Sequence, residues 1–359
     1  MSDHNPARNV TRWVMTAQGQ PCESVSEKLD APPAGEAVVE VAGCGVCHTD
    51  ISFLHMGVPT RAELPLALGH EISGKVVEVG EGVDAGLLGK AVLVPAVMPC
   101  GECALCKGGH GRICRAQIMP GNDRHGGFAS HVTVPARYLC PVPENVLAKH
   151  ELWELSVVAD AVTTPFQAVR SSGLAAGDLA ICIGTGGIGI HGVQIAAAVG
   201  AKVIALDIDD DKLAVAREHG AGAVVNTKDL GFKEIKGAVK AAAKELGAPP
   251  VRWRIFETSG TKPGQETAYG LLNFGAHLAV VGFTLAKSEI RLSNLMAFDA
   301  TAQGNWGCDA TLYPEVLEWI GDGRIQVSPF VERHALADIN SVLDAAHEGT
   351  LKRRGVLVP

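Results

Sequence analysis

Four cysteines stand close together in the motif Cys100-x2-Cys103-x2-Cys106-x7-Cys114. Zinc takes four thiolates at a closed, tetrahedral structural site, and four nearby glycines allow the tight turns that such a site requires. Two disulfides, an iron–sulfur cluster and unligated core cysteines are the other interpretations. Ferredoxin-type clusters use a different spacing, and disulfides fit a cytosolic chain poorly. The motif therefore predicts a structural zinc site.

A second motif, Gly184-Thr-Gly186-Gly-Ile-Gly189, follows an apolar run and opens a helical pattern. Glycines between a strand and a helix let the backbone approach a pyrophosphate, which sits on the helix N-terminus. Asp207 ends the next apolar run. A carboxylate there accepts from the adenosine ribose and repels a 2′-phosphate, which favours NAD over NADP. The alternatives are a glycine turn that binds nothing and, for Asp207, a helix cap or solvated strand end.

A third set is split along the chain into Cys47-His48-Thr49-Asp50 and Gly69-His70-Glu71. One thiolate and one imidazole are two of the three protein ligands that an open catalytic zinc site needs. By themselves, a cysteine and a histidine at this separation would more often be a coincidence than a site.

The elements that must position these residues change character near residue 160. Before it, short β-rich runs (37–41, 74–79 and 91–94) are separated by Gly/Pro turns, which predicts an antiparallel or barrel-like β domain. From residue 179, strands alternate with helices, which predicts a doubly wound parallel sheet in an α/β fold. The expected strands are 179–183, 202–206, 223–225, 252–257 and 277–281, and the expected helices are 187–199, 210–219 and 232–246. The last fifty or so residues are of mixed polarity and are expected to pack back on the first domain.

Composition excludes several classes of function. Of 359 residues, 47% are hydrophobic and 19% charged, which excludes a disordered chain. The net charge of −8 gives no general electrostatic grip on nucleic acid or on an anionic membrane. The most apolar stretch, residues 179–206, carries glycines at 184, 186, 187, 189 and 192 as well as polar residues, so a strand, turn and helix explain it better than a membrane span. Residues 1–6 lack the pattern of a signal peptide, and a cytoplasmic location is expected.

The chain resembles the zinc-dependent medium-chain alcohol dehydrogenases over nearly its whole length. The resemblance is carried by four motifs in the order that these enzymes have them: Gly43-Cys-Gly-Val-Cys-His-Thr-Asp50, Gly69-His-Glu-Ile-Ser-Gly74, the four cysteines and the glycine motif. The resemblance implies a GroES-like, β-rich catalytic domain over 1–160 and 309–359, with a structural zinc lobe at about 95–117. It implies a Rossmann NAD-binding domain over 161–308, with the active site in the cleft between the domains.

The resemblance also locates the third ligand of the catalytic zinc. Many members have a cysteine there, in a segment ending Thr-x-Tyr/Phe, but Asp160-Ala-Val-Thr163-Thr164-Pro-Phe166 contains none. It matches the D-x-x-T-T-x-F form of some bacterial members, which implies Cys47, His70 and Asp160 as ligands. A capping role is the alternative for Asp160. This set is harder than Cys₂His, so it would hold zinc less tightly and admit other divalent ions.

Catalytic roles follow from the same resemblance. Zinc would lower the pKa of a bound alcohol, as it lowers that of bound water to about 7. Thr49 would take the alcohol proton, with a hydroxyl bonded to its own backbone as the alternative. Asp50 would hold the far nitrogen of the ligating histidine. Glu71 would be either a spare ligand or purely structural. Several members end the proton relay in a histidine where this chain has Ser52, so the relay ends in water or takes another route; His55 is not assigned that role.

NAD is the implied cofactor. The implied pyrophosphate contacts are His48 and Arg354, with a solvated surface position as the alternative for each. The implied cofactor-binding residues are His48, Thr164, Gly184, Gly186, Gly187, Ile188, Gly189, Asp207, Lys212, Val281 and Arg354.

Two narrower features, Arg12-Trp-Val-Met15 and the run Gln117–Phe128, resemble one branch, the 6-hydroxycyclohex-1-ene-1-carbonyl-CoA dehydrogenases of anaerobic aromatic degradation. That resemblance implies an acyl-CoA substrate whose ring 6-hydroxyl is oxidised to a ketone, and the family implies a homodimer or homotetramer. The alternatives are a general secondary alcohol or polyol dehydrogenase, a reductase adding hydride to a conjugated enoyl thioester, and a non-catalytic NAD-binding protein.

Overall fold

The computed structural model describes residues 8–359, which form two compact units. One unit contains the described residues through Asp160, together with Gly307–Gly321 and Val327–Pro359. The other contains Ala161–Trp306 and Asp322–Gln326. Each unit has its own sheet and its own hydrophobic core. The expectation that no signal peptide opens the chain concerns residues 1–6, which lie outside the described residues.

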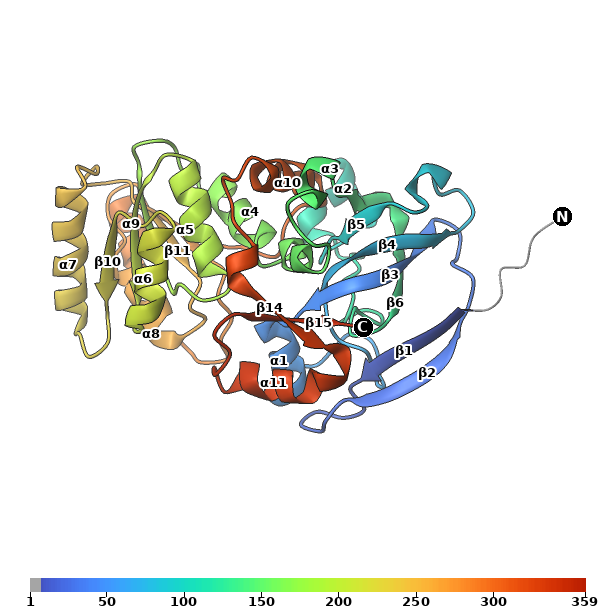
Figure 1. Cartoon of the computed structure of the whole chain (residues 1–359). Coiled ribbons are helices and arrows are strands. Elements are labelled where there is room, and N and C mark those ends of the chain that lie inside the picture. Colours follow the sequence, from blue (N-terminus) through green and yellow to red (C-terminus); the bar gives the residue numbers. More distant parts are fainter. Residues whose placement is uncertain (1–7) are drawn as a thin grey trace. The chain divides into compact units, whose positions relative to one another are not determined.

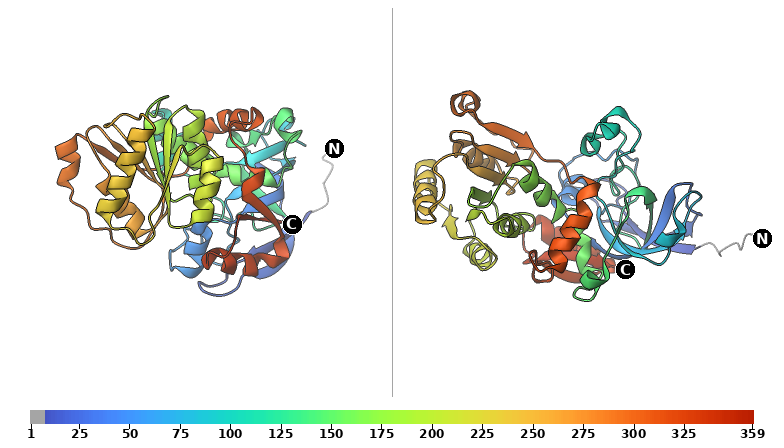
Figure 2. Two further views of the ribbon diagram at one scale, coloured as in Figure 1. Left: turned by 60° about the vertical axis from the view of Figure 1, so that its left-hand side comes forward. Right: turned by 90° about the horizontal axis from the view of Figure 1, so that it is seen from above.

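The second unit is built on six parallel strands in the order β10-β9-β8-β11-β12-β13, with helices on both faces of the sheet (Figures 1 and 2). This 3-2-1-4-5-6 order is that of dinucleotide-binding sheets, and it confirms the predicted doubly wound fold. The strands are β8 (Leu179–Ile183), β9 (Lys202–Asp207), β10 (Ala223–Asn226), β11 (Arg254–Glu257), β12 (His277–Val280) and β13 (Thr301–Gly304). The helices are α4 (Thr163–Ser171), α5 (Gly189–Ala198), α6 (Asp210–Glu218), α7 (Phe232–Glu245), α8 (Lys262–Gly270) and α9 (Ser293–Phe298).

Local sequence explains where these elements begin and which face they bury. β8 is buried along its whole length, as expected of a central parallel strand, and it reads as an unbroken apolar run. Helix α6 begins after Asp209, whose carboxylate accepts from the backbone of the first turn, and α8 begins after Thr261, which caps it in the same way. On α7 the buried residues are Ile235, Val239, Ala242 and Ala243, which recur at helical spacing.

The first unit is a mostly antiparallel β structure, as predicted. Its seven-stranded sheet runs β14-β15-β3-β4-β5-β7, with β6 also paired to β3, and β1 and β2 form a separate antiparallel pair (Figure 1). The C-terminal strand β15 joins the sheet beside β3, so the last residues of the chain belong to this unit. The strands are β1 (Arg8–Val14), β2 (Glu23–Leu29), β3 (Glu36–Gly45), β4 (Glu71–Val79), β5 (Ala91–Val94), β6 (His131–Pro135), β7 (Cys140–Pro141), β14 (Val331–Ala335) and β15 (Arg354–Val358). The α-helices of this unit are α1 (His48–His55), α2 (Ala104–Lys107), α3 (Glu144–Leu147), α10 (Tyr313–Gly321) and α11 (Ile339–His347).

Among the described residues, none of the helices combines the length and the hydropathy needed to cross a bilayer. The stretch 179–206 is instead divided between β8, α5 and β9, with the glycine turn between the first two.

Candidate functional site

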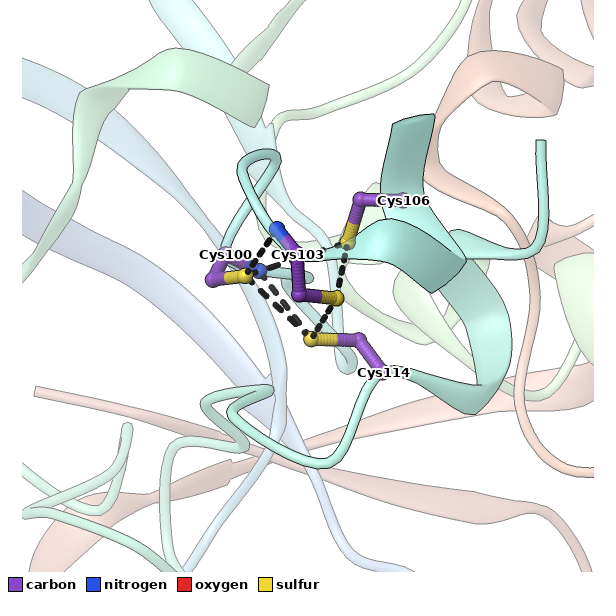
Figure 3. Close-up of side chains that lie close together, drawn as sticks. All are labelled: Cys100, Cys103, Cys106 and Cys114. Atoms are coloured by element: carbon purple, nitrogen blue, oxygen red, sulfur yellow. Dashed lines mark hydrogen bonds between the residues drawn. The ribbon is translucent and has the colours of Figure 1, made fainter. Parts of the chain in front are cut away.

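The four cysteines of the predicted lobe lie around one point (Figure 3). Cys103 stands just before the short helix α2, Cys106 lies within it, and Cys114 follows the 3-10 turn Gly111–Ile113. Their Sγ–Sγ distances are 3.5 Å for Cys103–Cys106 and Cys100–Cys114, 3.8 Å for Cys103–Cys114 and 3.9 Å for Cys100–Cys106. Four thiolates at about 2.3 Å from a tetrahedral zinc would lie about 3.8 Å apart, whereas a disulfide needs about 2.05 Å. The arrangement therefore fits one zinc ion, and all four thiols are free of disulfides.

Backbone groups of the lobe favour the thiolate form of Cys100, whereas burial and the neighbouring Cys103 raise the pKa of Cys106 to about 12. Hydrogen bonds from the backbone at Glu102 and at Cys103 lower the pKa of the Cys100 thiol to about 6. The backbone N–H of Cys103 lies 3.4 Å from that sulfur.

A second group of metal-binding side chains is formed by Cys47, His70, Glu71 and Asp160, whose ligand atoms all lie within 4.8 Å of one another. Cys47 stands between the end of β3 and the start of α1, His70 directly precedes β4, and Asp160 ends the 3-10 helix Glu154–Ala159. Asp160 Oδ2 is 3.6 Å from His70 Nε2 and 3.9 Å from Cys47 Sγ. Bonds of about 2.0–2.3 Å to a tetrahedral ion would hold such ligands about 3.3–3.8 Å apart. The three residues that the sequence pairs with a catalytic metal are thus brought together in a geometry that fits one.

Asp50 supports this group from behind. One carboxylate oxygen accepts the backbone N–H of Cys47 at 3.0 Å, and the other accepts that of Gly69 at 3.0 Å. The latter oxygen also lies 3.5 Å from Nδ1 of His70, the nitrogen that faces away from Asp160. Burial lowers the pKa of His70, but the charge of Asp50 and hydrogen bonds to neighbouring acidic groups raise it well above its ordinary value. The carboxylate of Asp50 thus lies beside the ring of His70, and its orienting role stays a prediction.

Glu71 is fully buried and forms a bidentate ion pair with Arg354 of β15. Arg354 Nε donates to Glu71 Oε2 at 2.7 Å and Nη2 donates to Oε1 at 2.5 Å, and the arginine side chain is only 8% exposed. Burial would lower the pKa of Arg354, but the charge of Glu71 raises it, so the guanidinium stays protonated. Arg354 therefore does not occupy the solvated position weighed as its alternative. Its contact with a pyrophosphate stays a prediction, and its pairing with Glu71 has no signal in the sequence.

The residues of α1 considered for the proton relay differ in whether they lie near the metal-binding group. The hydroxyl of Thr49 is 3.7 Å from Cys47 Sγ, on the side of the metal group, and His48 is exposed. Ser52 is buried, and its hydroxyl donates to the backbone carbonyl of His48 at 2.8 Å. The ring of His55 instead stacks on His347 of α11, with centroids 4.7 Å apart. Ser52 is thus engaged within its helix and His55 is stacked on another helix, and the route by which the proton leaves stays a prediction.

In the second unit, the three glycines of the fingerprint meet different surroundings. Gly184 has φ +84, and a Cβ there would lie 2.6 Å from the Cα of Ser259. A Cβ at Gly189 would collide with the carbonyl of Gly184, whereas one at Gly186 would meet open space. The turn is thus tight at its first and third glycines and open at the second, where a pyrophosphate would approach the backbone. Thr258 was not indicated by any motif, although its hydroxyl donates to the carbonyl of Gly184 at 2.7 Å.

Asp207 ends β9 beside this turn. Its Oδ2 accepts from the backbone N–H and the hydroxyl of Thr185, at 2.7 and 3.0 Å, and its Oδ1 accepts from the backbone of Ile208 at 2.8 Å. The carboxylate is therefore fixed at the strand end, next to the glycine turn, as a ribose-binding acid must be. Of the other expected cofactor residues, Gly187 and Lys212 are exposed, Ile188 and Val281 are partly buried, and Thr164 is buried.

Comparisons with known proteins give one consistent result. Residues 33–144 match the family described as Alcohol dehydrogenase GroES-like domain, and residues 187–322 match Zinc-binding dehydrogenase. An alcohol dehydrogenase of Geobacillus stearothermophilus is 32% identical over 324 residues, covering 90% of this chain and 91% of its own. One of Moraxella sp. (strain TAE123) is 30% identical over 348 residues, covering 94% and 96%. The crystal structure of AibC has a TM-score of 0.86 at 25% identity and covers 98% of this chain and 96% of its own.

Proposed function

Because the chain belongs to the zinc-dependent medium-chain alcohol dehydrogenase family, we propose that it oxidises a secondary alcohol to a ketone with NAD as hydride acceptor. The observation that carries this proposal is the convergence of Cys47, His70 and Asp160 within ligand distance of one point. Thiolate, imidazole and carboxylate form a donor set that suits zinc at an open site. When bound there, the metal acts as a Lewis acid that lowers the pKa of the alcohol.

The chain's own residues then have distinct tasks. Cys47, His70 and Asp160 hold the metal, and Asp50 fixes the ring of His70. The hydroxyl of Thr49, on the side of the metal group, receives the alcohol proton and passes it outward. Glu71 takes no part in the proton transfer, because both of its carboxylate oxygens accept hydrogen bonds from the guanidinium of Arg354.

The choice of NAD is supported by the second unit. Gly186 leaves the space that a pyrophosphate needs, and Asp207 is fixed beside it. Asp209, Asp210 and Asp211 follow after Ile208, and their charges would repel a 2′-phosphate on the adenosine ribose. We therefore expect a strong preference for NAD over NADP.

For the substrate, we propose 6-hydroxycyclohex-1-ene-1-carbonyl-CoA, oxidised to its 6-oxo product in anaerobic benzoyl-CoA degradation. The support is the resemblance carried by Arg12–Met15 and Gln117–Phe128. The metal group accommodates a general secondary alcohol or a polyol equally well, and the relatives named above are alcohol dehydrogenases. A cytoplasmic location and a homodimeric or homotetrameric assembly also stay predictions.

The test follows NADH formation with the CoA thioester, cyclohexanol, 2-propanol and a polyol, using the wild type and Cys47→Ala. Turnover of the thioester alone, abolished in the variant, supports the proposed substrate. Turnover of the simple alcohols alone removes the substrate and keeps the reaction. Full activity in Cys47→Ala refutes the metal-dependent reaction, provided that the variant binds NAD as the wild type does. Deuterated NADH used in the reverse direction separates reduction at C–O from reduction at C–C, because the label then appears on a different carbon.

A further inference from the structure

Glu257 is a fully buried carboxylate at the carboxyl end of β11. β11 lies between β8, which leads into the glycine turn, and β12. The strand order reverses between β8 and β11, and dinucleotides bind across the carboxyl ends of the strands at that point. Asp207, expected on the adenosine ribose, ends β9 on the other side of β8. The ends of β11 and β12 therefore face the nicotinamide half.

The hydrogen bonds found for the Glu257 side chain in the described residues go to one of its two carboxylate oxygens. Its Oε1 accepts from the backbone N–H groups of Ser259 at 2.9 Å and Gly260 at 3.2 Å, and from the Ser259 hydroxyl. Its Oε2 is buried, and no hydrogen-bond partner for it exists within residues 8–359. A Cβ placed on Gly282 would lie 2.7 Å from that oxygen. Burial raises the pKa of Glu257, while hydrogen bonds from Ser259 and from the backbone of Gly260 and Gly282 oppose the rise.

Ser259 and Gly260, the two residues that donate to Glu257, pack against Gly184 of the glycine turn and Gly282 after β12. The Cα of Ser259 lies where a Cβ on Gly184 would point, 2.6 Å away, and Gly260 packs against Gly282 so closely that only glycine fits. The Ser259 hydroxyl also lies 3.0 Å from that of Thr261, the residue that caps α8. One carboxylate thus connects the ends of β8, β11 and β12 with the start of α8.

We propose that Glu257 is a positioning residue of the cofactor site, which holds Ser259 and Gly260 against Gly184 and Gly282 and so shapes the surface that receives the nicotinamide half of NAD. The inference rests on the proposed use of NAD. Its chemical basis is that a carboxylate is an acceptor on both oxygens, so it satisfies three donors without introducing one of its own. A glutamine would place an amide N–H₂ in this buried space, and whichever way it turned, a buried donor would lack a partner or oppose another donor.

The test measures the dissociation constants of NAD and of AMP for the full-length, zinc-loaded protein and for Glu257→Gln, in the absence of any alcohol. Because the uncharged amide holds the three donors less strongly or opposes one of them, NAD binding should weaken by about tenfold or more. AMP, which lacks the nicotinamide half, should bind within about twofold of the wild type, because Asp207 and its partners are unchanged. Asp178→Asn is the matched control, because Asp178 accepts from Ala175 at the opposite end of the same sheet.

Ser259→Ala provides a second, milder variant in case Glu257→Gln does not fold. It should weaken NAD selectively and by less, and the double variant should show a non-additive loss. A merely structural role predicts equal weakening of AMP and NAD, and that result overturns the proposal. So does unchanged NAD affinity in both folded variants. If the wild type itself binds AMP but not NAD, the proposed cofactor fails, and the role of Glu257 fails with it.

Discussion

Replacing Asp160 with asparagine should remove the catalytic metal and leave the structural one in place. The change keeps the size of the side chain and removes its charge. With zinc bound, Cys47 and Asp160 are the two anionic ligands of the ion, and the pair Glu71–Arg354 is neutral by itself. Asparagine would remove one of these anionic ligands and leave a neutral, weaker oxygen donor in a group whose other members are at most 4% exposed. The attraction that is lost is large because the site is shielded from water.

The magnitude can be bounded from below. Removing a residue that only orients a metal ligand costs 10–100-fold in metal affinity, so removing a ligand should cost at least about 100-fold, or about 2.7 kcal/mol. Metal analysis after dialysis against a weak chelator should give two zinc ions per chain for the wild type and one for Asp160→Asn. Oxidation of the alcohol should fall by about a thousandfold or more, because the Lewis acid is lost.

A matched control is Asp84→Asn, since Asp84 is an exposed acid of the same unit that only caps a short 3-10 turn. It should keep both zinc ions and full activity. Two zinc ions and full activity in Asp160→Asn would refute the assignment and leave Glu71 as the third ligand, which requires Arg354 to release it.

The remaining predictions concern the ion pair, the glycine turn and the cysteine lobe. Glu71→Gln should lower the free energy of unfolding by about 3–5 kcal/mol in urea titrations, because it leaves a buried guanidinium without its counter-charge. Adding Arg354→Met to this variant should recover part of the lost stability. A loss below about 1 kcal/mol in Glu71→Gln would contradict the buried ion pair. Gly186→Ala should leave the melting temperature nearly unchanged and weaken NAD binding by about tenfold. Gly189→Ala should lower the melting temperature, because its Cβ collides with the Gly184 carbonyl. Equal melting temperatures for the two variants would contradict a turn that is open at Gly186 and tight at Gly189. Cys114→Ser should reduce the zinc content by one ion and make the lobe sensitive to protease while the catalytic zinc remains, and loss of both ions would mean that the two sites depend on each other.

Some features of the fold could be predicted because they leave a periodic or spaced trace in the sequence. The apolar run of β8 is buried along its whole length, and it was expected at Leu179–Ile183, where it lies. β13 escaped prediction because its residues, Thr301–Gly304, are all exposed and carry no apolar alternation. It is a strand only because β12 offers it a hydrogen-bonding edge, which is a tertiary property.

The same distinction holds for the site. The cysteine lobe is local, so its spacing alone indicates a metal. The group formed by Cys47, His70 and Asp160 is not local, and its third member could be named only through the resemblance to a family. The pairing of Glu71 with Arg354 left no trace, because two charged residues 283 positions apart carry no pattern that one sequence can show. Glu257 likewise reads as the polar end of a strand until its partners are seen.

The separation of Glu71 from Arg354 also bears on the order in which the protein is made. The cysteine lobe spans Cys100 to Cys114, so it can bind zinc as soon as that short segment leaves the ribosome. The catalytic group needs β3, β4 and the segment ending at Asp160. Arg354, which pairs with Glu71 in that group, is made only with β15, the last strand of the chain. Contacts between such distant segments form late in folding. A growing chain could therefore close the cysteine lobe early in its synthesis, whereas the buried ion pair beside the catalytic group can form only when the polypeptide is finished.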